Sequence, residues 1–197
     1  MKAAIPLYRQ AVKQDPGFGL AYARLSYVQS QLAWFGRGET EEQRLIADAR
    51  ANAERALQLA PSLPAAHLAI GFSDYWGHGD YEVALKSFAA ALVLRPNDAD
   101  TLAAQGFVQR RQGRFDAGIV SLERAFALDP RNSSLAYETG STYMMTSRYP
   151  DTERWLRRAL DIDAENRNAQ VYLPNSILLA TGDIPAALAA AQGDDRR

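Results

Sequence analysis

Apolar residues recur along the chain at the spacing of one face of an α-helix, and the same pattern returns several times. Phe115, Ile119, Leu122 and Phe126 show it well, because they follow one another at intervals of 4, 3 and 4 residues. Such intervals place the four side chains on one face of a helix. Pro130 ends this helix, since the residue before a proline avoids α-helical backbone geometry.

A second predicted helix precedes this one within residues 97–130. Asp98 or Asp100 provides an N-cap for it, and its pattern continues to about Gln112. Gly113 follows at the place where a helix must stop and turn. The segment therefore predicts a hairpin of two antiparallel helices.

The landmarks of this hairpin return along the chain with a period of about 34 residues. Prolines close an apolar helix at Pro16, Pro61, Pro96 and Pro130, and Ala164 takes the same place in the next copy. A fixed period of this length predicts stacked supersecondary units, each of which buries its apolar face against its neighbours.

The repeated spacing resembles the tetratricopeptide repeat (TPR) family, which places leucine-glycine and an aromatic in its first helix and alanine, an aromatic, alanine and proline in its second. Residues 62–96 match with His67, Ile70, Gly71, Tyr81, Ala84, Phe88, Ala91 and Pro96. Residues 97–130 match with Leu102, Gly106, Phe115, Gly118, Leu122, Ala125 and Pro130, and residues 131–164 with Ala136, Gly140, Tyr143, Tyr149, Leu156 and Ala159. The resemblance implies an all-α fold, a right-handed α-solenoid of stacked antiparallel helix hairpins.

We expect residues 1–197 to form a single TPR array with irregular ends. The expected divisions are an orphan second helix in 1–16, an extended hairpin in 17–61, regular repeats in 62–96, 97–130 and 131–164, and a degenerate C-terminal repeat with a tail in 165–197. The orphan helix either caps the array or follows an upstream part of a longer natural protein. Its apolar Leu7 and Tyr8 favour the second alternative, because a terminal repeat needs a polar outer face.

The extended hairpin carries eleven residues beyond the period, since Pro16 and Pro61 are 45 positions apart. Its first helix is predicted from about Gly19 to Phe35 and its second to about Leu59, with a break at residues 36–38. Thr40 and Gln43 have the spacing of a capping box at the start of the second helix. The hairpin should therefore protrude beyond its neighbours.

Aromatic side chains mark the edge of the array at this protrusion. The tip carries Trp34 and Phe35, and the next hairpin has one extra residue in the turn that contains Tyr75 and Trp76. Either these rings pack on one another and brace the long hairpin, or Trp34, Phe35 and Trp76 form an edge patch for a partner.

The last copy departs from the pattern at a proline. Pro174 falls inside the first helix of residues 165–197, so we expect a kink or a helix start near it. The second helix, from Pro185 to about Gln192, is short, and residues 193–197 form a polar tail.

Composition narrows the function further. The 22 basic and 23 acidic residues nearly balance, so no basic stripe indicates nucleic-acid binding. The chain has no cysteine and no apolar run of membrane-spanning length, and its first residues do not have the pattern of a signal peptide. We expect a cytoplasmic protein, without membrane insertion, and leave open that the chain is part of a larger one.

Candidate catalytic residues are few. His67 occupies a large-residue position of a first helix, which favours a structural role. His78 lies in a glycine-rich turn beside Asp74 and Asp80, but one imidazole with loose carboxylates does not fix a metal geometry. The sequence also lacks phosphate-binding and nucleophile-elbow motifs. We therefore expect no enzyme activity, no cofactor and no metal.

The family resemblance implies that first helices line a concave groove. Carried over by phase, the peptide-binding positions are Tyr27, Leu68, Phe72, Tyr75, Phe107, Arg110, Tyr137, Met144 and Asn175. This lining is aromatic and apolar with one cation, Arg110, and it suits an extended peptide or a helix with apolar anchors. Capture of a chaperone tail is disfavoured, because Leu68 and Tyr137 stand where such clamps need polar residues.

The sequence thus predicts a non-catalytic scaffold that binds a peptide or partner protein in this groove. A terminal helix of the same or another copy is an alternative occupant, which would mean self-association through the terminal repeats. A second hypothesis rests on similarity to TPR regions attached to bacterial signalling proteins such as cyclases, kinases and transcription regulators. That similarity lies in residues 18–25, in the Trp34-Phe35-Gly36 break and in the Tyr75-Trp76-Gly77 turn.

Overall fold

The computed structural model describes residues 3–35 and 39–193, and at residues 39 and 40 the backbone only. These residues form eleven α-helices and one π-helix and contain no strand, so the all-α prediction is confirmed. The chain divides into two compact units, Met1–Ala104 and Gln105–Arg197, and the division falls inside α6 (Ala99–Arg111).

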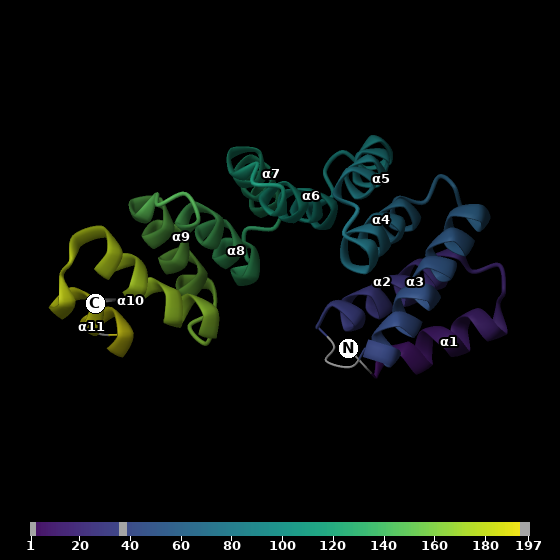
Figure 1. Ribbon diagram of the computed structural model, residues 1–197, viewed down its shortest axis with the longest axis horizontal. Helices are drawn as coiled ribbons and strands as arrows, with labels where there is room; N and C mark the ends of the chain where they lie inside the picture. Colours follow the sequence, from purple (N-terminus) through teal and green to yellow (C-terminus); the bar gives the residue numbers. More distant parts are fainter. Residues whose placement is uncertain (1–2, 36–38, 194–197) are drawn as a thin grey trace. The chain divides into compact units, whose positions relative to one another are not determined.

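The first unit is a series of antiparallel helices joined by short turns (Figure 1). Its elements before α6 are α1 (Ala4–Gln14), α2 (Gly19–Phe35), α3 (Glu39–Leu59), α4 (Pro64–Phe72), the π-helix η1 (Ser73–His78) and α5 (Tyr81–Leu94). Helix α2 packs along α3 and also contacts α1 and α4, and α4 pairs with α5. The long first hairpin is therefore held by helices on more than one side.

Small side chains bring the helices of this unit close together. The buried cluster where α2, α3 and α4 meet consists of Ala23, Ala53, Ala56, Ala66, Ala69 and Ile70. Gln29 is buried in the same hairpin and accepts a hydrogen bond from the Asn52 side-chain amide at 2.8 Å. Buried polar groups need such partners, and this pair joins α2 to α3.

The extra residue of the second hairpin is absorbed by η1. A π-helix closes each turn with one more residue than an α-helix, so it accommodates a single insertion without breaking the helix. The backbone N–H of Asp80 donates to the carbonyl of Asp74 at 3.1 Å. Gly79 then turns the chain with a φ of 67°, in the left-handed region that suits glycine.

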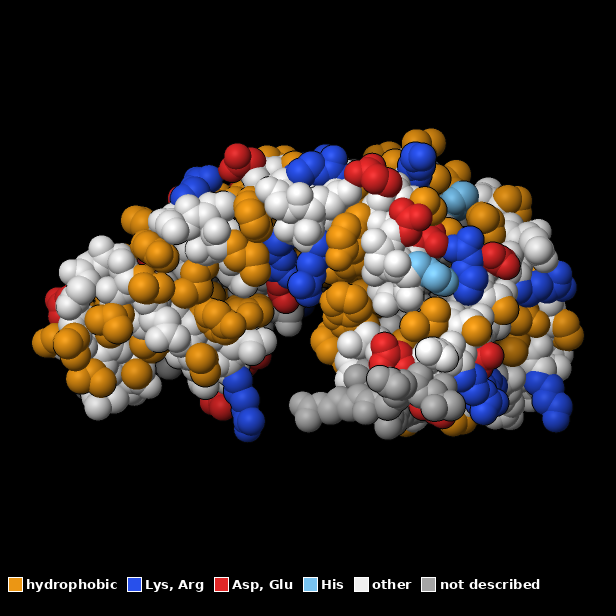
Figure 2. All heavy atoms as spheres, in the orientation of Figure 1, with side chains coloured by type: hydrophobic (Ala, Val, Ile, Leu, Met, Phe, Trp, Pro, Cys, Tyr) orange, Lys and Arg blue, Asp and Glu red, His pale blue; other side chains and the backbone are white. Residues whose placement is uncertain are grey.

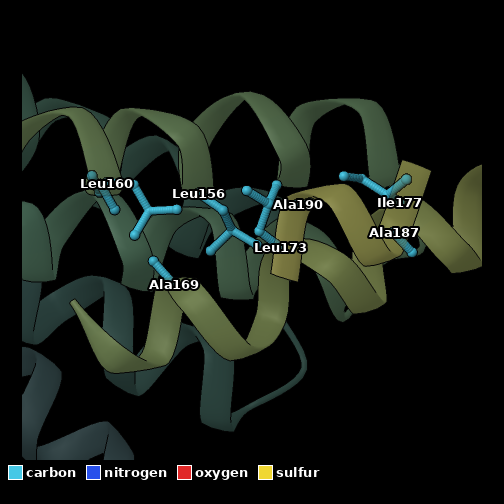
Figure 3. Close-up of a cluster of buried hydrophobic side chains, with 9 residues drawn as sticks. Leu156, Leu160, Ala169, Leu173, Ile177, Ala187 and Ala190 are labelled. Carbon is cyan, nitrogen blue, oxygen red and sulfur yellow. The ribbon is translucent and has the colours of Figure 1, made fainter. Parts of the chain in front are cut away.

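The second unit continues with α7 (Phe115–Leu128), α8 (Ser133–Met144), α9 (Tyr149–Ile162), α10 (Arg167–Thr181) and α11 (Ile184–Gln192). Consecutive helices from α7 to α11 pack on one another. The buried side chains of α9, α10 and α11 converge on one cluster, with Leu156, Leu173 and Ile177 among its largest members (Figure 3). This cluster also includes Ala136 of α8.

Polar caps begin the first helices of successive hairpins. Asp98, Asn132 and Asn166 stand one repeat apart, and the side chain of each accepts a hydrogen bond from the backbone N–H three residues later, at 3.1 Å in all three cases. Each cap satisfies one of the N–H groups that the first turn of a helix leaves without a partner.

Of the two alternatives expected at Pro174, a kink or a helix start, the structure excludes the helix start. Helix α10 begins at Arg167 and runs through the proline. The Asn175 side-chain amide donates to the carbonyl of Val171 at 3.0 Å, within the turn that the proline interrupts. The helix tolerates the proline because Leu173 and Ile177 on its buried face are held in the core. The expected break at residues 36–38, the capping box at Thr40 and most of the polar tail lie outside the described residues.

Candidate functional site

The first helices of the first unit carry four of the expected groove residues, and two of them are not accessible. Tyr27 and Leu68 are half-buried, as expected for a binding face. Phe72 and Tyr75 are only 4% exposed each. The prediction that these two rings line an open groove was wrong. Aromatic side chains of the long α2 and of η1 cover them, and the sequence pattern did not indicate this.

The covering side chains form one aromatic cluster. Tyr27 meets Phe72 edge-on with ring centroids 5.0 Å apart, and Trp76 stacks on Phe72 at 4.2 Å. Trp34 and Trp76 both contact Tyr75, with ring centroids 5.6 and 5.8 Å from that of the tyrosine. Offset and edge-on pairs of this kind add stability beyond their buried area.

The three residues of the expected edge patch do not form one exposed surface. Trp76 belongs with the groove aromatics, since it contacts both Tyr27 and Phe72. Trp34 touches Tyr75 and stays partly exposed. Phe35 is 65% exposed, which leaves it as the most accessible ring of the three.

The carboxylate of Asp74, which the sequence analysis considered only as a loose neighbour of His78, is buried next to these rings. Asp74 of η1 is 5% exposed and forms an ion pair with Arg50 of α3. Arg50 also pairs with Glu54 at 2.7 Å, one helical turn away. Burial raises the pKa of Asp74 above its ordinary value, although the neighbouring Arg50 opposes the shift. No local pattern signals this pair, because Arg50 and Asp74 belong to different hairpins.

Arg110 of the second unit forms an ion pair. Its guanidinium donates to Glu138 at 2.7 Å and to the hydroxyl of Thr142 at 3.2 Å, and it lies 5.4 Å from the ring centre of Phe107. The sequence analysis predicted this cation but not the ion pair that neutralises it. Glu138 was missed because it stands next to the phase-matched position, at Tyr137, on the following first helix.

Two tyrosine rings on α8 and α10 lie close to one another. Tyr137 and Tyr172 are 5.8 Å apart between ring centroids and are tilted to one another. Burial, with the negative charge of Glu138 next in importance, raises the pKa of Tyr137. Met144 is half-buried and Asn175 is exposed. Phe107, Arg110, Glu138, Tyr137 and Tyr172 define what we call the tyrosine face.

The last two helices expose further apolar side chains, and Figure 2 shows hydrophobic groups at the surface of this part of the chain. They are Val171, Leu178 and Leu179 of α10 and Ile184 and Leu188 of α11. An isolated exposed apolar residue is ordinary, but five on two adjacent helices are typical of an interaction surface.

The two histidines make local contacts. The His67 ring nitrogen Nε2 lies 2.7 Å from the carbonyl oxygen of Pro61, and His78 Nδ1 lies 3.2 Å from that of Ser73. No group of three or more potential metal ligands occurs in the described part of the chain. Within the same residues, none of the helices has the length and apolar character needed to cross a bilayer.

The family model for the tetratricopeptide repeat matches residues 72–117 and again residues 103–167. Residues 72–167 of the chain therefore belong to the TPR family. The chain is a helical-repeat scaffold of the kind that serves protein–protein interaction, and proteins of this kind are generally non-catalytic.

Solved structures show the same fold. A thermophilic TPR protein of Thermus thermophilus superposes with a TM-score of 0.76 at 20% identity, over 90% of each chain. A MamA structure gives a TM-score of 0.68 at 17% identity, over 82% of this chain and 95% of that one. MamA from Desulfovibrio magneticus gives a TM-score of 0.67 at 19% identity, over 89% of this chain and 96% of that one. Such likenesses show the fold, and no curated protein sequence matches the chain.

Proposed function

We propose that this TPR chain is a non-catalytic, cytoplasmic scaffold that binds a peptide or partner protein on the exposed faces of its first helices. The observation that carries the proposal is the tyrosine face, where the paired rings of Tyr137 and Tyr172 lie on adjacent first helices. No cofactor, metal or nucleic acid takes part in this function.

The chemistry of the tyrosine face suits a peptide with both apolar and polar groups. Tyrosine offers a large apolar ring with a hydroxyl, and its few rotatable bonds limit the entropy lost on binding. The Arg110–Glu138 pair adds a donor and an acceptor fixed to one another at 2.7 Å. Because both charges already have a partner, they contribute orientation more than net attraction.

The test uses a defined ligand. A peptide is selected from a random display library on the intact chain, synthesised, and titrated against the double variant Tyr137→Ala/Tyr172→Ala. We expect at least about a tenfold loss of affinity, because paired aromatic anchors commonly dominate an interface. Val93→Ala is the matched control, since Val93 is exposed on the second helix α5.

Two results would count against the proposal. One is a selected peptide that binds the double variant as tightly as the unaltered chain. The other is an equal loss in the Val93 control, which would place the contact elsewhere. Far-ultraviolet circular dichroism of each variant checks that the helices persist.

Of the groove residues expected in the first unit, Tyr27 and Leu68 remain accessible, and we propose that they extend the same binding function. Phe35 is proposed as an additional contact at the tip of α2, because its ring is largely exposed. A Phe35→Ala variant that binds every selected peptide normally would remove this edge contact from the proposal.

A second candidate is that the chain is a regulatory or sensory TPR segment of a larger bacterial signalling protein. The aromatic residues that carry this similarity include Trp34 and Trp76, which both contact Tyr75 in the first unit. The coding frame upstream of Met1 tests the idea: a continuous frame with a catalytic or DNA-binding motif supports it, and an in-frame stop contradicts it.

Self-association through the terminal repeats is the third possibility that the surface favours. The exposed apolar residues of α10 and α11 are its basis, and Leu179 and Leu188 are its most direct test positions. Sedimentation of the intact chain and of Leu179→Ser/Leu188→Ser decides it, because a monomer at all concentrations would exclude this mode.

A further inference from the structure

A separate pocket lies on the second helices of the second unit, away from the residues of the tyrosine face. Its volume is about 420 Å³, within the range that ligand pockets occupy. Phe126 of α7 and Trp155 of α9 lie in its wall, and their rings meet edge-to-face at 4.9 Å with an angle of 87°. Both rings pack against the buried cluster of α9, α10 and α11, so the apolar wall is fixed in place.

Three arginines surround this apolar wall. Arg154, Arg157 and Arg158 line the pocket together with one carboxylate, Asp161. All four stand on α9, and the distance along the helix from residue 154 to 161 is about 10 Å. That length matches about three residues of an extended peptide, which is more than a single small anion can span.

Ion pairs already neutralise two of the arginines. Arg154 pairs with Asp151 at 2.9 Å, and Arg157 pairs with Glu153 at 2.9 Å. Arg158 has no ion pair with any residue in the described part of the chain. It is therefore the cation that remains for an incoming carboxylate, while Asp161 disfavours negative charge at its own end of the pocket.

We propose that the pocket between α7 and α9 binds an acidic peptide segment of a partner protein, with one apolar side chain against Phe126 and Trp155 and a neighbouring carboxylate on Arg158. The aromatic wall supplies the apolar contact, and the unpaired arginine selects the charge. The site shares no residue with the tyrosine face, so the two surfaces can be tested separately.

Trp155 provides a direct readout. Trp34 and Trp76, the other two tryptophans, lie in the first unit and are replaced in a Trp34→Phe/Trp76→Phe background, which keeps an aromatic ring at both places. The probe is the peptide acetyl-Glu-Glu-Phe-Gly-Gly-amide. Tryptophan fluorescence of the intact chain is followed during titration at low and at high salt.

We expect a saturable change in tryptophan fluorescence with a dissociation constant of about 100 µM at low salt. Binding should be weaker at high salt. Arg158→Ala should weaken binding about two- to fivefold, in line with an exposed charge, and Arg158→Glu should weaken it further. Arg124→Ala is the matched control, because Arg124 is an exposed arginine of α7 that does not line the pocket. Phe126→Leu should also weaken binding by shrinking the apolar wall.

Three outcomes would overturn the proposal. The first is that the fluorescence change does not saturate at millimolar peptide. The second is an equal response to acetyl-Lys-Lys-Phe-Gly-Gly-amide. The third is that phenylacetate binds as tightly as the peptide, which would mean a small-anion pocket. The Tyr137→Ala/Tyr172→Ala variant should bind the probe normally. Failure of this site and failure of the tyrosine face are thereby distinguished.

Discussion

Phe88 of α5 occupies the space that a side chain at Gly71 of α4 would need. A Cβ atom at Gly71 would overlap the Phe88 ring, and Phe88 itself is fully buried. We expect Gly71→Ala to lower the free energy of unfolding by about 2–3 kcal/mol, because a packed core cannot yield to an added methyl group. Urea unfolding followed by circular dichroism measures the change.

Two further variants decide whether the ring is the cause. Gly17→Ala should be nearly neutral, since a Cβ there would meet only the Asp15 side chain, at the surface. Gly71→Ala/Phe88→Leu should be less destabilised than the sum of the two single changes. Strict additivity would show that the ring is not what excludes a side chain at Gly71.

Removal of Arg50 should destabilise the first unit at neutral pH. Arg50→Met leaves the buried Asp74 carboxylate without its ion-pair partner, which we expect to cost about 2 kcal/mol or more. Adding Asp74→Asn should recover most of that loss, because the buried charge is then gone. Urea unfolding of both variants measures this, and an unchanged Arg50→Met protein would contradict it.

The pH dependence of stability provides a second test of Asp74. Since burial raises the pKa of Asp74 above its ordinary value of 3.8, the folded chain holds this proton more tightly than the unfolded chain. Its contribution to stability is therefore present below that ordinary value and is lost as the pH rises through the raised pKa. Asp74→Asn should remove this decrease. The measurement is the urea midpoint of the unaltered chain minus that of Asp74→Asn at a series of acidic pH values. This difference should fall as the pH rises.

Tyr143 should titrate late and stabilise the fold below its pKa. Burial, followed by the hydrogen bond to Glu123 at 2.6 Å, raises its pKa from 10.0 to about 12. The stabilisation is present below pH 10.0 and is lost as the pH rises toward about 12. Tyr143→Phe should cost about 1.5 kcal/mol at neutral pH.

Phenolate absorbance checks the Tyr143 prediction directly. The difference between the unaltered chain and Tyr143→Phe should contain one tyrosine that ionises well above the ordinary value. A midpoint near pH 10.0 for that difference would contradict the prediction, because it would mean that the fold does not raise the pKa of Tyr143.

Replacement of Pro174 should stabilise the chain. The proline lies inside α10 and cannot donate to the carbonyl four residues earlier, whereas alanine can. We expect Pro174→Ala to raise the free energy of unfolding by about 1–3 kcal/mol. Pro150 lies in the first turn of α9, where no such donor is needed, so Pro150→Ala should not stabilise the chain. Thermal unfolding measures both, and a lower midpoint for Pro174→Ala would contradict the prediction.

Local pattern was sufficient to predict the helices. The intervals between Phe115 and Phe126 and the position of Gly113 determine α7 and the turn before it, because both depend on residues close in sequence. The family could be identified for the same reason. The course of α10 could not, since the packing of Leu173 and Ile177 outweighs the local preference of Pro174.

The candidate site was harder to predict, because its character depends on pairs from different hairpins. Phase alone located Arg110 and Tyr137 but could not show that Glu138, on the following first helix, neutralises the arginine. It also could not show that Trp76 would cover Phe72, since the π-helix that places Trp76 there follows from a single added residue.

The widened turn of η1 has an evolutionary consequence. Tyr81 opens α5 and Phe115 opens α7 at the same phase of the next repeat, so the added residue leaves the downstream period unchanged. One codon gained at this point in the gene alters a single bend and leaves the neighbouring modules intact. A lineage can therefore try new surface chemistry at such bends, one amino acid at a time, without rebuilding the framework that holds them.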